Sequence, residues 1–505
     1  MKLKVLLRSI KNSVLFLLFL SACNLWGQQK DSTKIKIQSS SVQELKDQLE
    51  ETFNDPNFNT ANWGVMIKSL KTGEILYKKN ADKLFIPASN HKLFTTSAAL
   101  IILGDNFTYD TKLLLNGSIR NGKIAGDLII KGMGDPTLSS KFIQGGAIKI
   151  LEEWADSLKA KGINEIFGNI IGDDSAFDNV PLGKGWAHDN EQFWYSAESG
   201  ALSINDNCIR FFVKPTTVGQ LADVSIEPQT NYVNIINNIF TVSPTDDEGI
   251  SFSRKTGTNE ITLTGKIHKN SKVISDYVAI TNPTRYFLSL FKDVLEQKGF
   301  KLSGELKRIN TVTYKIDEDE LVVLADHKSM PLRDIVKETN KNSNNFFAEQ
   351  LFKTIGFIGL NLGSVENGIK ACRELFNDMG VNLDNMVFVD GSGLSRLNMV
   401  TPRHIINLLS YMYKSESFEP FYNSLSIAGI DGSLSSRMRK TSAENNVHAK
   451  PGYNLGVSAL SGYVRTHDGE PLVFCMIVNN YLVPSSLATY IQDLVCIRLA
   501  NFSRN

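Results

Sequence analysis

The chain has 505 residues, 42% of them hydrophobic and 21% charged, with a formal net charge of +1. A chain of this size can bury large cores and should form two or three domains. It carries no long basic run, which argues against a nucleic acid partner. The 7 histidines lack metal-ligand spacing and no glycine-rich phosphate loop is present, so we expect neither a metal nor another cofactor.

The N-terminal segment has the pattern of an export signal. Basic residues precede the apolar run Val14–Leu20, and Leu20-Ser21-Ala22-Cys23 then resembles a bacterial lipoprotein cleavage box. We therefore predict a signal peptide over residues 1–22, a lipid on Cys23 that anchors an exported, periplasmic protein to the membrane, and a polar tether over residues 23–40. The alternative is a plain signal peptide cut nearby, with Cys23 incidental.

Ser89-Asn90-His91-Lys92 is the first segment whose residues could carry out catalysis. Pro87 ahead of it and an apolar run behind it predict a helix start, and Gly104 is suited to end that helix. Residues three apart share a helix face, so the Lys92 amine can reach the Ser89 hydroxyl and activate it as a nucleophile. Free backbone N–H groups at a helix start would also favour an oxyanion.

Residues 108–282 differ in pattern from the flanks at 41–107 and 283–505. They contain many short β-type runs separated by Gly, Asn and Asp, whereas the flanks carry longer helical patterns. We expect one discontinuous catalytic domain of mixed α/β (α+β) class, formed by the two flanks and interrupted by β-rich inserted domains. Cys208, Cys372, Cys475 and Cys496 fit no metal site, and their pairing cannot be read from the sequence.

Two further elements lie beyond the insert. Ser343-Asn344-Asn345 is a polar cluster that enters an apolar helical run, which by itself also suits an ordinary capped helix start. Lys450-Pro451-Gly452 precedes two strand-like runs joined by Asp468-Gly469. Ser89 and Ser343 lie 254 positions apart (343 − 89), which leaves room for one or two additional domains.

Other copies of these short patterns are expected to be structural. Ser289 and Lys292 fall inside an uninterrupted amphipathic helix, and Ser203-Ile204-Asn205 lacks a comparable polar loop and helix pair. The triplets at Lys71 and Lys255 are predicted to be turns between strands.

In this order the three elements resemble the S-x-x-K, S-x-N and K-T-G set of the penicillin-recognising serine enzymes. The chain is most similar to the D-alanyl-D-alanine carboxypeptidase/endopeptidase family, the low-molecular-mass class C penicillin-binding proteins. Other segments carry the likeness: Gly126–Leu138, Leu202–Asn207, Asp390–Arg396 and Gly429–Leu434. The resemblance runs from about Trp63 to the C-terminus, and it implies the serine transpeptidase/β-lactamase-like fold.

The resemblance also implies the roles. Ser89 would attack the penultimate D-Ala carbonyl of a peptidoglycan stem peptide with Lys92 as base, and β-lactams would acylate the same serine. Ser343 would relay the proton to the leaving amine, Asn345 would bind the substrate backbone, and Lys450 would supply positive charge. The backbone N–H groups of Ser89 and Tyr453 would form the oxyanion hole in a strand that contains Gly452.

Two further positions bear on the expected substrate preference. Asp189, in a stretch that resembles the family's Trp-and-Asp segment, could pair with the amine of a diaminopimelate-type side chain; the alternative is a surface aspartate. Pro451 replaces the threonine of the family. The loss of that hydroxyl predicts an enzyme that is indifferent to the substrate's terminal carboxylate and leans toward cross-link cleavage.

Two other interpretations remain open from the sequence. The altered third motif suits a catalytically weakened lipoprotein that binds stem peptides without turning them over. A β-lactamase or esterase of the same fold is the other alternative, and the long insert and the Asp390–Arg396 segment argue against it.

Overall fold

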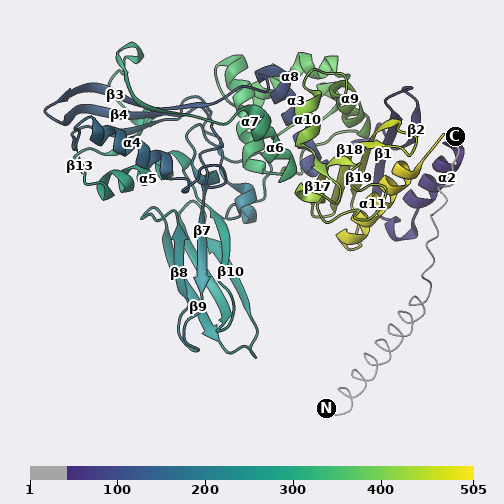
Figure 1. Cartoon of the computed structure of the whole chain (residues 1–505), viewed down its shortest axis with the longest axis horizontal. Helices are drawn as coiled ribbons and strands as arrows, with labels where there is room; N and C mark the ends of the chain where they lie inside the picture. The colour runs from purple at the N-terminus through teal and green to yellow at the C-terminus, as the bar shows by residue number, and fades with distance from the viewer. Residues whose placement is uncertain (1–41, 505) are drawn as a thin grey trace.

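The computed structural model describes residues 42–504 (Figure 1). The predicted signal peptide, the tether and Cys23 lie outside these described residues. Among the described residues, no helix combines the length and apolar character needed to cross a membrane.

A six-stranded sheet forms the centre of the part of the molecule that contains the three motifs. Its order is β16-β17-β18-β19-β1-β2, so N-terminal strands pair with C-terminal ones. The central strands β18 and β19 are buried almost throughout, as expected for apolar runs covered on both faces. The strands are β1 (Asn62–Ser69), β2 (Ile75–Lys79), β16 (Ser426–Ile427), β17 (His448–Asn454), β18 (Val457–Arg465) and β19 (Pro471–Asn479).

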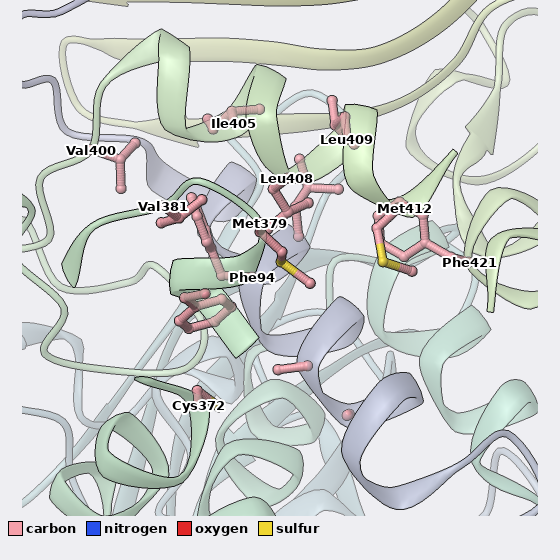
Figure 2. Close-up of a cluster of buried hydrophobic side chains, with 14 of the residues drawn as sticks. Phe94, Cys372, Met379, Val381, Val400, Ile405, Leu408, Leu409, Met412 and Phe421 are labelled. Atoms are coloured by element: carbon pink, nitrogen blue, oxygen red, sulfur yellow. The ribbon is translucent and has the colours of Figure 1, made fainter. Parts of the chain in front are cut away.

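Helices cover both faces of this sheet. Alternate residues of β19 point to opposite sides: Phe474 and Met476 pack in the core beneath the terminal helices, whereas Val473 and Cys475 face the core shown in Figure 2. The terminal helices are α2 (Val42–Phe53) and α11 (Ser485–Asn501). The opposite face is covered by α3 (Lys92–Leu103), α6 (Leu332–Lys341), α7 (Asn345–Leu360), α8 (Val365–Asp378), α9 (Pro402–Met412) and α10 (Phe418–Ser424).

The segment between the first two motifs forms separate sheets with their own core. One is built on β3 and β4, and two three-stranded sheets project from the body as a finger (Figure 1). The strands are β3 (Asp110–Arg120), β4 (Lys123–Lys131), β5 (Glu165–Ile166), β6 (Ile170–Asp173), β7 (Cys208–Lys214), β8 (Asp223–Glu227), β9 (Asn234–Val242), β10 (Gly249–Arg254), β11 (Glu260–His268) and β12 (Ile274–Ala279).

The mixed α/β class is therefore confirmed, while the domain boundaries stay a prediction. The sheet built on β3 takes three more strands from beyond residue 282: β13 (Lys301–Leu302), β14 (Leu306–Arg308) and β15 (Val322–Lys328). Two helices, α4 (Lys149–Ala160) and α5 (Pro283–Gln297), pack on each other in the same core. We propose that the insert ends near Lys328.

Candidate active site

Ser89 lies in η2 (Ala88–His91), a single 3₁₀ turn that leads directly into α3. The residue before it, Ala88, has a φ of 46°, in the left-handed region that residues other than glycine rarely adopt. Such conformations persist where the surrounding structure imposes them, often at functional sites. The helix ends at Gly104 with a φ of 84°, so its predicted start and end are both confirmed.

Lys92 is fully buried at the start of α3, and its amine contacts three oxygens. Nζ lies 3.1 Å from Ser89 Oγ, 2.5 Å from Asn345 Oδ1 and 2.7 Å from the Ser392 carbonyl. A neutral amine has two N–H donors and one lone pair. The amide and carbonyl oxygens can only accept, so they take both donors and leave the lone pair for the Ser89 proton.

The environment favours that neutral form. Burial lowers the pKa of Lys92 to about 7, against the opposing charges of Asp390 and Glu349. A lysine amine with its ordinary pKa near 10.4 would be almost fully protonated at neutral pH. The Lys92 amine is therefore poised to accept a proton near neutrality.

Ser343 and Asn345 stand at the start of α7. Asn344 caps this helix by accepting a hydrogen bond from the Phe347 N–H, so the capped helix start expected from the sequence is present. Ser343 has a φ of 56°, again in the left-handed region. The capping role belongs to Asn344, which leaves the Asn345 side chain to contact Lys92.

Lys450 comes to Ser343 from strand β17. Its fully buried amine donates to Ser343 Oγ at 2.8 Å and to the Pro451 carbonyl at 2.9 Å. Burial, together with the charge of Lys92, lowers the pKa of Lys450 well below its usual value. The structure thus brings together five predicted side chains from three distant segments: Ser89, Lys92, Ser343, Asn345 and Lys450.

Gly452 is where β17 meets the turn that carries Ser89. A Cβ atom on Gly452 would lie 2.8 Å from the Pro87 carbonyl oxygen and 3.0 Å from the Ser89 nitrogen, too close for a real side chain. Beyond Ala449, β17 pairs only with β18 among the described strands, so this stretch is an edge. Pro451 is accommodated there, as edge strands tolerate a missing N–H.

The remaining predicted positions lie at the margin. Tyr453 is exposed and lines the cleft beside Ser89. Asp189, in η3 (His188–Asn190), is exposed and does not line that cleft. It lies close enough to Tyr195 to contribute, after burial, to the raised pKa of that tyrosine.

The other pattern copies are structural, as expected. Ser289 lies in the middle of α5, and the triplets at Lys71 and Lys255 are turns at the ends of strand pairs. The Ser203 hydroxyl donates to the Gly200 carbonyl within the insert and does not line the cleft that contains Ser89 and Ser343.

Several contacts at the site were missed from the sequence. The Asn345 amide nitrogen donates to the Tyr195 carbonyl at 2.7 Å, which fixes the amide so that its oxygen faces Lys92. Tyr195 belongs to η4 (Trp194–Ser196), in the insert. A backbone carbonyl carries no sequence signal, so only the fold reveals this contact.

Two buried carboxylates, Glu349 and Asp390, hold the loop that contains the Ser392 carbonyl, the third oxygen in contact with the Lys92 amine. Glu349, on α7, accepts from the Gly391 N–H at 3.1 Å and the Ser392 N–H at 2.8 Å. Asp390 accepts from Trp186 of the insert at 2.9 Å and from the Ser395 N–H at 2.6 Å. Together they fix the loop whose carbonyl contacts Lys92. In the sequence, the Asp390–Arg396 segment stands out only through its resemblance to the family, and Glu349 carries no such signal.

A cleft of about 530 Å³ runs past the two serines, between the end of β17 and the start of α11. Its lining is Ser89, Ser343, Ser433, Arg437, Pro451, Gly452, Tyr453, Ser458, Ala459, Ser485, Ser486 and Thr489. No group of His, Cys, Asp or Glu within residues 42–504 is arranged to hold a metal ion. The four cysteines described are buried and unpaired.

Known proteins resemble this chain over most of its length. The profile of the D-Ala-D-Ala carboxypeptidase 3 (S13) family matches residues 45–499. The chain is 32% identical over 472 residues to a D-alanyl-D-alanine carboxypeptidase of Actinomadura sp. (strain R39), covering 91% of this chain and 85% of that protein. It is 28% identical to the D-alanyl-D-alanine carboxypeptidase DacB of Haemophilus influenzae, covering 83% of this chain and 86% of that protein.

Solved structures agree with these relatives. The crystal structure of penicillin binding protein 4 (dacB) from Haemophilus influenzae matches with a TM-score of 0.76 at 25% identity, covering 88% of this chain and 98% of that one. A second structure of that protein, complexed with a β-lactam, matches with a TM-score of 0.71.

Proposed function

The chain belongs to the D-Ala-D-Ala carboxypeptidase 3 (S13) family of serine peptidases, and we propose that it hydrolyses the terminal D-Ala-D-Ala bond of peptidoglycan stem peptides through an acyl-enzyme on Ser89. Its fold is that of the penicillin-recognising serine enzymes. The observation that carries the proposal is the contact of the Lys92 amine with Ser89 Oγ at 3.1 Å, in a site where burial lowers the pKa of Lys92 to about 7.

In the first step Ser89 Oγ attacks the carbonyl carbon of the penultimate D-Ala, and Lys92 Nζ takes the hydroxyl proton. The backbone N–H groups of Ser89 and Tyr453 would stabilise the oxyanion of the tetrahedral intermediate. Asn345 holds the amine of Lys92 and would hydrogen-bond the substrate backbone.

In the second step the C–N bond breaks, and Ser343, in contact with Lys450, relays to the leaving amine the proton that Lys92 took from Ser89. Water then hydrolyses the ester on Ser89 and releases the shortened peptide. We propose that penicillin forms the same ester and remains there because its hydrolysis is slow, and that the peptide cross-links of peptidoglycan are a second substrate.

Because peptidoglycan lies outside the cytoplasmic membrane, we propose that the protein is exported, with Cys23 as its lipid anchor. A role as a catalytically weakened binding protein is less well supported, since Lys92 contacts both Ser89 and Asn345, and Lys450 contacts Ser343, despite Pro451. Asp189 remains proposed as a contact for the substrate's side-chain amine.

Mass spectrometry after incubation with benzylpenicillin tests the proposal. The wild type should gain the mass of one penicillin on Ser89, and Ser89→Ala should gain none. Ser289→Ala is the matched control, because its serine and lysine have the same spacing but lie in the middle of α5. An adduct that persists on Ser89→Ala protein would overturn the assignment of the nucleophile.

A further inference from the structure

The cleft that contains Ser89 and Ser343 continues beyond the motif residues to a wall that the mechanism does not use. This wall consists of Ser433 and Arg437, in and just after η9 (Gly432–Leu434), and of Ser485, Ser486 and Thr489 in the first turns of α11. Arg437 is the cationic member of this wall. None of the residues that line the cleft is an aspartate or a glutamate.

The guanidinium of Arg437 is held in place from behind. Its Nε and Nη2 donate to Asp493 Oδ1 at 2.9 and 2.7 Å, and Nη2 also reaches the Thr489 carbonyl and Gln492 Oε1, each at 3.3 Å. Asp493 itself does not line the cleft. A fixed guanidinium loses little freedom when it binds a ligand, which favours affinity.

One nitrogen of this side chain is left over. Nη1 donates to no residue of the described chain. It is not fully buried either, so it reaches solvent. A guanidinium N–H that reaches solvent at a cleft wall, with hydroxyl groups beside it, is suited to an anionic oxygen. The N-terminus of α11, which begins at Ser485 without a side-chain cap, adds to the positive potential.

We propose that Arg437 and the neighbouring serines bind the carboxylate of the amino acid that leaves the scissile bond. This inference rests on the proposed peptidase function. Ser343, the proposed proton donor to the leaving amine, lines the same cleft, and the carboxylate of the leaving residue is only two bonds from that amine. Arg437 thereby compensates for the hydroxyl that Pro451 lacks. The enzyme then recognises the terminal carboxylate, although the third motif alone predicts that it is indifferent to this group.

Steady-state kinetics with a pair of peptides test this assignment. One peptide ends in D-Ala-D-Ala with a free carboxylate, and the other carries a C-terminal amide. The wild type should prefer the acid by about tenfold or more in kcat/KM, since the loss of a hydrogen bond to a charged group weakens binding by at least about that factor. Arg437→Gln should lose this preference through a lower kcat/KM for the acid, with the amide unaffected.

Asp493→Asn is the control that separates recognition from structure. It weakens the support of the guanidinium but keeps Arg437, so the acid preference should remain. If Arg437 served only to bind Asp493, both variants would lose activity equally on both peptides, which would overturn the assignment. An absent acid preference in the wild type would overturn it as well.

The stability of the variants and the proposed function are checked separately. Circular dichroism and thermal denaturation report whether each variant is folded; if Arg437→Gln is unfolded, Arg437→Lys replaces it. That variant keeps the charge but loses the planar fork, and its acid preference should fall several-fold; an unchanged preference would contradict the proposal. A wild type that is neither labelled nor active contradicts the peptidase function itself, whereas an active wild type with an unaltered Arg437→Gln variant contradicts only this subsite.

Discussion

At the residue scale, the exclusion of solvent around Lys92 decides how the serine is activated. The same amine at an exposed position would be held protonated, as is expected of surface lysines. Here burial lowers its pKa, while the carboxylates of Asp390 and Glu349 limit the shift. The proposed activation of Ser89 would therefore depend on Asp390 and Glu349, which do not line the cleft.

Replacing Lys92 by alanine should slow acylation by penicillin by at least about a hundredfold, the usual range for a lost general base. In the wild type the acylation rate should rise with pH through about 7, because the neutral amine is the active form and its pKa lies there. Stopped-flow labelling between pH 5 and 9 measures both effects. Lys341→Ala is the control, since the Lys341 amine is bound to Asp431 and the Leu425 carbonyl; near-normal labelling of Lys92→Ala would show that another base acts.

The close packing of Gly452 against the turn that carries Ser89 leads to a second prediction. In Gly452→Ala the new methyl group would collide with backbone atoms of Pro87 and Ser89, so the turn that carries the nucleophile must shift. The required shift is a few tenths of an ångström; because a displacement of about 1 Å costs on the order of a hundredfold in rate, we expect penicillin labelling to slow by roughly tenfold. Gly249→Ala, at a strand position with nothing within 4 Å of the added Cβ, is the control. Equal penicillin labelling rates for the two variants would contradict this account.

At the scale of elements, helix α7 links the chemistry to the insert. Its first residue, Asn345, contacts Lys92, and Glu349 one turn later supports the loop at Ser392. Further along, Gln350 bonds with Gly134 and Gly200, and Lys353 with Asp178. The helix thus holds the proposed catalytic group Asn345 at one end and bonds with the insert along its length.

Glu349→Ala should lower the free energy of unfolding by about 2 kcal/mol or more, because two buried N–H groups lose their acceptor. It should also slow acylation, since the Ser392 carbonyl is no longer fixed toward Lys92. Glu349→Gln keeps one acceptor oxygen, so its stability and acylation rate should lie between those of Glu349→Ala and the wild type. The exposed Glu366→Ala should match the wild type in both. Urea unfolding and penicillin labelling measure the two effects; a Glu349→Ala protein with wild-type stability would contradict the role.

The elements also show how far the sequence could lead. Local patterns predict the start of α3, the capped start of α7 and the structural Ser289–Lys292 copy in α5. They can do so because neighbouring residues determine helix ends and amphipathic faces. Local patterns do not predict the contact of the Tyr195 carbonyl, the Glu349 contacts or the place of Arg437, since each depends on residues far apart in the chain. Helix α4 was missed within a segment dominated by short strands.

At the scale of the whole molecule, the proposed location of the enzyme rests on the sequence of a segment outside the described residues. The sequence of residues 20–23 predicts a lipid on Cys23 and hence a protein held at the membrane. Cys23→Ser should move the protein from the membrane fraction to the soluble periplasmic fraction, with penicillin labelling unchanged because the active site is untouched. Cell fractionation followed by labelling measures this. A soluble wild-type protein that begins beyond residue 23 would contradict the prediction.

The contact between Asn345 and the Tyr195 carbonyl has a consequence for the order in which the protein matures. The nucleophile, the insert carbonyl and the amide come from three stretches of chain, and closing such long loops delays their encounter during folding. The amide can be oriented only after the insert has docked. We therefore expect the proposed peptidase activity to appear only after this long-range contact between the insert and α7 has formed.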